Sequence, residues 1–121
     1  MSKTKIIEHK GTKIFYIDFS KLTKFDEIKA VTVEAQKYIH TQALSSALTL
    51  ANVEDTHFNS EIRDMFTEYI KSNKPYVKAS AVIGVSGLKQ ILYNTMMKLS
   101  GRDVRSFSTI EQAKDWLASQ K

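Results

Sequence analysis

The sequence predicts an α/β fold: a single domain spanning residues 1–121, with a mixed sheet of about five strands and about four helices. Two β-rich runs that flank a glycine-containing turn open the chain and indicate a hairpin. Segments with helical apolar spacing then alternate with short apolar runs, as expected for helices that connect parallel strands. The composition, 42% hydrophobic and 26% charged, is that of a globular domain with its own core.

The amino-terminal half supplies the hairpin, one helix and one strand. Residues 4–9 and 13–19 are predicted to pair, and the second run is apolar on both faces, as in a strand covered on both sides. Thr23 is predicted to cap a helix whose apolar residues recur as far as Ile39. A short buried strand is then predicted over residues 46–53.

The next helix is predicted to start at Asn59 or Ser60 and to stop before Pro75, because an apolar stripe fills the interval. A strand is predicted over residues 77–85. The final strand is predicted at 104–107, ahead of the last helix.

The segment GVSGLKQ, residues 84–90, joins a strand to a third helix predicted over residues 87–100. It lacks the spacing of a hydrolase elbow, a P-loop or a dinucleotide fingerprint. We therefore predict that Ser86 caps this helix with its hydroxyl and that Gly101 ends it. The apolar stripe expected to face the sheet comprises Leu88, Ile91, Leu92, Met96 and Leu99.

The last helix is predicted to begin with a capping box, Ser108 to Glu111. Its apolar positions place Ile110, Ala113, Trp116 and Leu117 on the buried side, with Trp116 packed inward beside Ile110 and Leu117. If Trp116 is fully buried, its replacement by alanine costs about 3–5 kcal/mol.

Charge is unevenly distributed along the chain. The net charge is +5, yet residues 71–105 hold seven lysines and arginines against Asp103 alone. This segment is either a solvated surface or a weak nucleic-acid binding surface. Only three of the 18 basic residues are arginine, which disfavours base readout, so nucleic acid is not the partner we expect.

Several classes of site and location are disfavoured by composition. The absence of cysteine excludes disulfides and thiolate metal sites, and no histidine spacing indicates another metal centre. No apolar run reaches the roughly 18 residues of a membrane span. The first residues lack the apolar core of a signal peptide, so we expect a cytoplasmic protein. Because no residue spacing indicates a metal or cofactor site, we expect no metal and no other cofactor.

Four stretches carry a family resemblance. They are IFYIDFS (14–20), ALTLANVEDTHF (47–58), KPYVKASAVIGVSGLKQIL (74–92) and FSTIEQAKDWL (107–117). With the order of elements, they resemble the STAS domain of anti-sigma-factor antagonists and sulfate-transporter tails, and especially a compact bacterial subgroup that is also compared with lipid-binding CRAL-TRIO domains. The resemblance implies a non-enzymatic regulatory or binding module. It would act through protein–protein contact or a small anionic or lipidic ligand, and a homodimer is compatible with it.

The resemblance also implies a phosphorylation site to inspect. Regulatory STAS domains are phosphorylated on a serine just after the third strand, within an Asp-Ser-Ser-Gly motif. Here Asp55 and Thr56 match the first two positions, with threonine for serine, whereas His57 and Phe58 replace the last two. Thr56 is therefore the candidate phosphoacceptor.

The candidate ligand site lies where the carboxyl ends of the parallel strands are expected to meet. Its residues are Asp18, Asp55, His57, Ser86 and Lys89. Free amides at a helix start and Lys89 one turn in would favour a small anion. The alternative is a small hydrolase in which Ser86 or Thr56 is the nucleophile and His57 the base.

Overall fold

The computed structural model describes residues 3–120, which form one five-stranded mixed sheet in the order β1-β2-β3-β4-β5. The strands are β1 (Thr4–His9), β2 (Thr12–Asp18), β3 (Ala47–Asn52), β4 (Val77–Ile83) and β5 (Val104–Phe107). β1 pairs antiparallel with β2, and every later neighbour pairs in parallel. The predicted hairpin and mixed sheet are confirmed.

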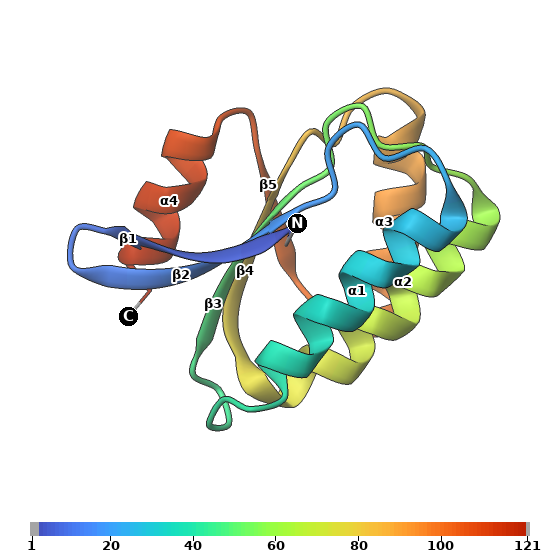
Figure 1. The fold of residues 1–121 in the computed structure, drawn as a ribbon. Helices are drawn as coiled ribbons and strands as arrows, with labels where there is room; N and C mark the ends of the chain where they lie inside the picture. Colours follow the sequence, from blue (N-terminus) through green and yellow to red (C-terminus); the bar gives the residue numbers. More distant parts are fainter. Residues whose placement is uncertain (1–2, 121) are drawn as a thin grey trace.

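Within residues 3–120 four α-helices cover the sheet unequally (Figure 1). They are α1 (Phe25–Ile39), α2 (Ser60–Asn73), α3 (Leu88–Ser100) and α4 (Ile110–Ala118), and a short 3-10 turn, η1 (Lys74–Tyr76), follows α2. α1, α2 and α3 lie on one face of the sheet, whereas α4 alone covers the other.

The two faces of the sheet form two hydrophobic clusters. On the three-helix side, Phe19 is 1% exposed and meets Phe66 of α2 edge to face, with ring centroids 5.0 Å apart. On the other side, Ile14 and Leu50 pack against Leu117 of α4. Phe15 and Ile17 of β2 belong to the first cluster and Ile14 to the second, so β2 contributes apolar side chains to both faces, as its sequence predicts.

Two predicted helix ends are confirmed. The side-chain oxygen of Asn59 accepts a hydrogen bond of 2.9 Å from the amide of Ile62 and caps α2. Gly101 ends α3 in the left-handed conformation, with φ of 68°. Both residues lie directly next to the helix end that they determine, so the sequence signal is local.

Two other predicted caps are wrong by one residue. α1 is preceded by Lys24 rather than Thr23, and no side chain within residues 3–120 caps it. At α4 the capping residue is Thr109, not Ser108, and its hydroxyl accepts from the amide of Gln112 at 3.2 Å. Two neighbouring hydroxyl residues offer the same capping chemistry, so the sequence does not distinguish them.

The predicted inward stripe of α3 is wrong at two of its five positions, Ile91 and Leu99, whereas Leu92 is half-buried. Ile91 and Leu99 are 64% and 58% exposed, and of the expected stripe only Met96 is buried. The side chain of Leu88 lies outside the described residues. Tyr93 and Met97 accompany Met96 on the inner face. Because both sides of α3 are apolar, its periodicity alone cannot indicate which side meets the sheet.

Trp116 packs with Ile110 against the cluster that contains Leu117, as predicted, but it is half-buried rather than fully buried. Leu117 and Ala113, with no exposed surface, hold the inward side of α4. The indole packs on Phe107, with centroids 5.6 Å apart, and lies 5.3 Å from the guanidinium of Arg105. The cost of Trp116→Ala should therefore fall below the range for a fully buried tryptophan.

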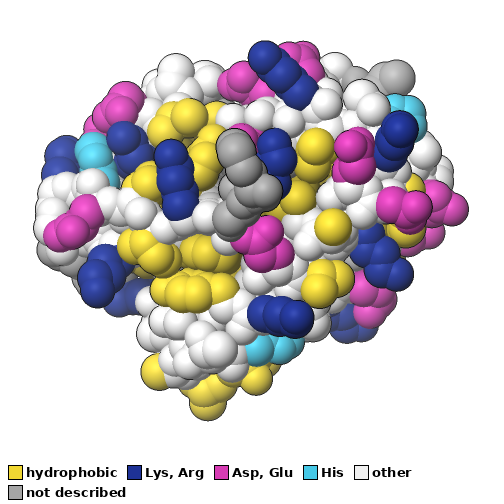
Figure 2. Space-filling model, viewed as in Figure 1, with side chains coloured by type: hydrophobic (Ala, Val, Ile, Leu, Met, Phe, Trp, Pro, Cys, Tyr) yellow, Lys and Arg dark blue, Asp and Glu magenta, His cyan; other side chains and the backbone are white. Residues whose placement is uncertain are grey.

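Charges of both signs are interspersed on the face that displays β1 and α1 (Figure 2). This face offers no extended field of one sign to a charged partner. Across residues 3–120, no helix has the length and apolar character needed to cross a membrane.

Candidate functional site

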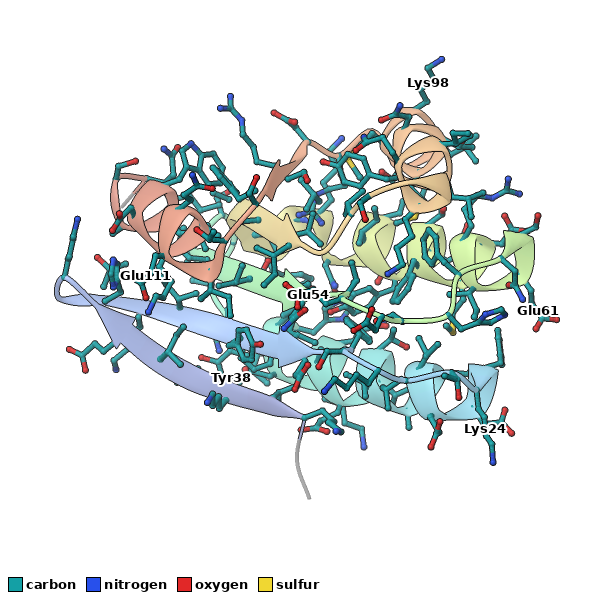
Figure 3. The ribbon with its side chains drawn as sticks, turned by 90° about the horizontal axis from the view of Figure 1, so that it is seen from above. Lys24, Tyr38, Glu54, Glu61, Lys98 and Glu111 are labelled. Atoms are coloured by element: carbon teal, nitrogen blue, oxygen red, sulfur yellow. The ribbon has the colours of Figure 1, made fainter. Side chains whose placement is uncertain are left out.

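The carboxyl ends of the parallel strands meet at one edge of the sheet, which Figure 3 views directly, with Glu54 near its middle. The loop after β3 is tied to the loop after β2 by backbone bonds. The amide of Lys21 donates to the Glu54 carbonyl and that of His57 to the Leu22 carbonyl, each at 2.9 Å. These bonds hold the loop residues in place beside the end of β4.

A polar cleft of about 460 Å³ opens at this edge. It is lined by Glu54, Asp55, Gly84, Val85, Ser86, Lys89, Ser106, Phe107 and Ser108. Three of the five predicted ligand-site residues, Asp55, Ser86 and Lys89, are thus brought together. The cleft holds two carboxylates, one ammonium group and three serine hydroxyls, so its chemistry is hydrogen bonding rather than strong attraction of one charge.

Ser86 does not cap α3, which corrects our prediction. The capping position belongs to Gly87, with φ of 58° and ψ of −130°, and none of the described side chains bonds there. Ser86 instead contributes its carbonyl, which accepts from the Lys89 amide at 3.1 Å. Its exposed side chain lines the polar cleft. A non-glycine residue is strongly disfavoured at the backbone angles of Gly87, so the turn moves the cap one residue on.

Beneath α3 lies an apolar cavity of about 80 Å³. Its walls come from the sheet, α2 and the inner side of α3, and they include Phe19, Ala51, Val53, Phe66, Tyr69, Val82, Tyr93, Met96 and Met97. The volume is roughly the share of three water molecules in the liquid.

Lys89 lies at the boundary between the apolar cavity and the polar cleft. It lines both, as does Val85. Its ammonium nitrogen donates to the carbonyl of Val53 at 2.8 Å, and no carboxylate among the described residues forms an ion pair with it. The positive charge thus lies at the entrance of an apolar space, with a neutral partner.

The other two predicted ligand-site residues lie outside the polar cleft. A carboxylate oxygen of Asp18 accepts from the amide and the hydroxyl of Ser20, at 2.9 and 2.6 Å, and so closes the turn after β2. The exposed His57 ring contacts the side chain of Asn59 at 3.3 Å. Both residues serve their own loops in this structure.

Thr56 is only 3% exposed, and its hydroxyl donates to the carbonyl of Phe19 at 2.7 Å. A phosphoryl group attached there would need the loop to open and this bond to break. The exposed side chains nearest to it in sequence, Asp55 and His57, carry no hydroxyl. Phosphorylation of Thr56 therefore remains a prediction that requires local opening.

The hydrolase alternative requires a hydroxyl within hydrogen-bond reach of a base. Within residues 3–120, no hydrogen bond joins His57 to Ser86 or to Thr56. No group of three acidic or histidine side chains in the same residues is arranged to hold a metal ion. In the described part of the chain, His57 is therefore not joined to either predicted nucleophile.

Alkaline pH should destabilise the fold through Tyr69, which lies in the wall of the apolar cavity. Burial raises the pKa of Tyr69 above its ordinary 10.0, although Arg102 and a hydrogen bond from Asn73 act in the opposite direction. Above about pH 10 the unfolded chain loses a proton that the folded chain retains, so the free energy of unfolding falls as pH rises.

Urea unfolding at intervals from about pH 8 to 11 measures this loss, whose limiting slope is about 1.4 kcal/mol per pH unit for one such group. Tyr69→Phe should flatten the curve. Tyr16→Phe removes a half-buried hydroxyl whose pKa burial also raises, and it should change the curve less. Equal curves for wild type and Tyr69→Phe would contradict the assignment.

The fold is that of the STAS domain. The chain is similar to an anti-sigma-factor antagonist (STAS) domain protein from Planctomyces limnophilus, with a TM-score of 0.65 over 97% of this chain and 98% of that chain. Sequence identity between the two is 12%, a level at which the likeness establishes the fold and nothing finer. No protein-family model and no curated protein matches the sequence.

The main feature that sequence reasoning missed is the apolar cavity. Met96 and Met97 were a usable signal, because paired methionines are typical of adaptable apolar surfaces. The serines at 106 and 108 were missed for another reason. They reach the polar cleft only because β5 pairs beside β4.

Proposed function

We propose that this chain is a non-enzymatic binding module that holds a single-chain lipid across the boundary between the polar cleft and the apolar cavity. The observation that carries the proposal is the position of Lys89, which lines both spaces. A lipid has the matching two-part chemistry: a head that needs hydrogen bonds and a tail that leaves water.

The polar cleft selects the kind of head group. Glu54 and Asp55 repel an anion, whereas Lys89 and three serine hydroxyls supply donors. These groups can satisfy the hydrogen bonds of a polyhydroxyl or zwitterionic head group better than those of a bare carboxylate. This refines the small anionic or lipidic ligand that the sequence resemblance implies.

The tail would enter beneath α3. The cavity of about 80 Å³ is well below the roughly 300 Å³ of an ordinary ligand pocket, so α3 must move outward on binding. α3 packs mainly on α2, and Met96 and Met97 on its inner side are flexible enough to fit around a chain. A tail in this space would gain van der Waals contacts with the apolar walls.

A cavity-filling substitution should distinguish this site from unspecific lipid binding. Ala51 is half-buried on β3 and lines the apolar cavity. Ala51→Val should weaken binding of 1-lauroylglycerol about tenfold, because its added methyl groups occupy the space that the tail needs. Methyl NMR of the methionines gives a local measurement, in which Met96 and Met97 should shift on titration while Met65 should not.

The matched control is Ala79→Val, a half-buried alanine on β4 that packs into the cluster on the opposite face. It should leave the affinity within about twofold of wild type. The proposal fails if both variants weaken binding equally, or if saturating lipid leaves the Met96 and Met97 methyl signals in place.

A regulatory role through protein contact is supported by the outer side of α3. Ile91 and Leu99 are both largely exposed there, and Lys98 projects away from the molecule (Figure 3). Since α3 must move for a tail to enter, occupancy of the apolar cavity would change the presentation of this surface. The STAS fold of an anti-sigma-factor antagonist supports the same reading by analogy alone.

A further inference from the structure

A second cleft opens at the opposite edge of the sheet, near the amino-terminal ends of β4 and β5. Its volume is about 410 Å³. It is lined by Lys74, Val77, Lys78, Ala79, Gly101, Arg102, Asp103, Arg105, Trp116 and Gln120. We call it the basic cleft, because four of these side chains are cationic and one is anionic.

The fold assembles the basic cleft from four separate elements. Lys74 comes from η1, Lys78 from β4, Arg102 from the turn after α3, and Arg105 from β5. In the sequence these residues are part of a diffuse basic segment, whereas the structure gathers them at one place and leaves Lys71 and Lys98 outside it. With Asp103 included, the side chains that line the basic cleft carry a net charge of +3. None of the four cations takes part in an ion pair among the described residues.

Arg102 is the strongest sign that an anion belongs in the basic cleft. It is the most buried of the four cations, and burial lowers its pKa below the ordinary value. Its guanidinium donates to the Ile70 carbonyl at 2.7 Å and to the Ser80 hydroxyl at 2.8 Å, both neutral acceptors. A partly buried charge without a counter-charge is unfavourable, so an anion that reaches it gains more than it would at the surface.

We propose that the basic cleft is a binding site for a small multivalent oxyanion of the phosphate class. Two guanidinium groups and two ammonium groups exceed what a single carboxylate can satisfy, and arginine forms paired hydrogen bonds to phosphate oxygens. The half-buried indole of Trp116 lies beneath the Arg105 guanidinium and lines the basic cleft on the α4 side. The site is independent of the polar cleft, which lies at the other end of the strands.

Pyrophosphate is a suitable probe, titrated by calorimetry at fixed, low ionic strength so that general screening stays constant. Arg105→Gln and Lys78→Gln should each weaken binding about tenfold, as expected for loss of one charge-assisted hydrogen bond. Arg102→Gln should weaken it further, and Arg102→Lys, which retains the charge, should recover part of the loss. A thermal unfolding curve of each variant separates loss of binding from loss of folding.

The matched controls are Lys71→Gln and Lys98→Gln, which remove the same charge from outside the basic cleft and should change affinity less than twofold. Equal weakening by controls and cleft variants would overturn the proposal, as would the absence of pyrophosphate binding to wild type. Comparison of pyrophosphate with citrate distinguishes phosphate from carboxylate sources. Preferential binding of a single-stranded oligonucleotide that depends on Lys71 and Lys98 as well would also overturn it, in favour of an extended nucleic-acid surface.

Discussion

Gly84→Ala should destabilise the fold by about 2–5 kcal/mol, measured as the free energy of unfolding in urea. Gly84 has φ of +94°, which L-residues rarely adopt. A Cβ atom there would also lie 2.5 Å from the backbone nitrogen of Glu54, closer than any real contact. The loop that carries Glu54 would have to shift, although its own hydrogen bonds to the β2–α1 loop hold it.

Gly87→Ala provides the control for this substitution. Gly87 also has positive φ, but, its own atoms and its two chain neighbours aside, no described atom lies within 4 Å of its ideal Cβ position. Gly87→Ala should therefore lower the free energy of unfolding only by the cost of the backbone conformation, about 1–2 kcal/mol. Equal losses at the two positions would show that the close approach of Glu54 contributes nothing to the cost.

Phe19→Ala should cost about 3–5 kcal/mol by the same measurement. The ring is 1% exposed and packs edge to face on Phe66. It also forms part of the wall of the apolar cavity, so truncation would join a new void to the existing one and leave a larger unfilled space. The expected loss is thus near the top of the range for a buried aromatic residue.

Phe58→Ala is the comparison for Phe19→Ala, since Phe58 is half-buried in the same aromatic cluster, 5.7 Å from Phe66 between ring centroids. Its truncation removes less buried surface and should cost less. If Phe19→Ala loses under about 1 kcal/mol, the neighbouring side chains collapse into the space and the cavity wall is not rigid.

The strands and most helices could be predicted because their signals are local. Alternation along β2, the glycine of the hairpin turn and the asparagine before α2 each act within a few residues of the structure they determine. Which side of α3 faces the sheet could not be predicted, and the reason is physical. Large apolar residues occur on both sides of this helix, and the bond from the Lys89 ammonium to the Val53 carbonyl, which ties the helix to the loop after β3, joins residues 36 positions apart.

The candidate site could be predicted in part. Strand ends point to Asp55, Ser86 and Lys89, because parallel strands end at a common edge. Asp18 and His57 come from the same kind of position, yet their side chains bond within their own loops. The basic cleft depends on strand order, which places β5 beside β4, so charge counting along the chain could indicate the excess but not its location.

The unequal covering of the sheet also has a consequence for the order in which the protein is built. The cluster of Ile14, Leu50 and Ile83 is closed only by α4, which is the last helix of the described chain. During synthesis the three-helix side can therefore consolidate while the other side of the nascent sheet is still open. A folding intermediate exposing that side is expected until residues 110–118 leave the ribosome, and this is the stage at which chaperone binding would matter most.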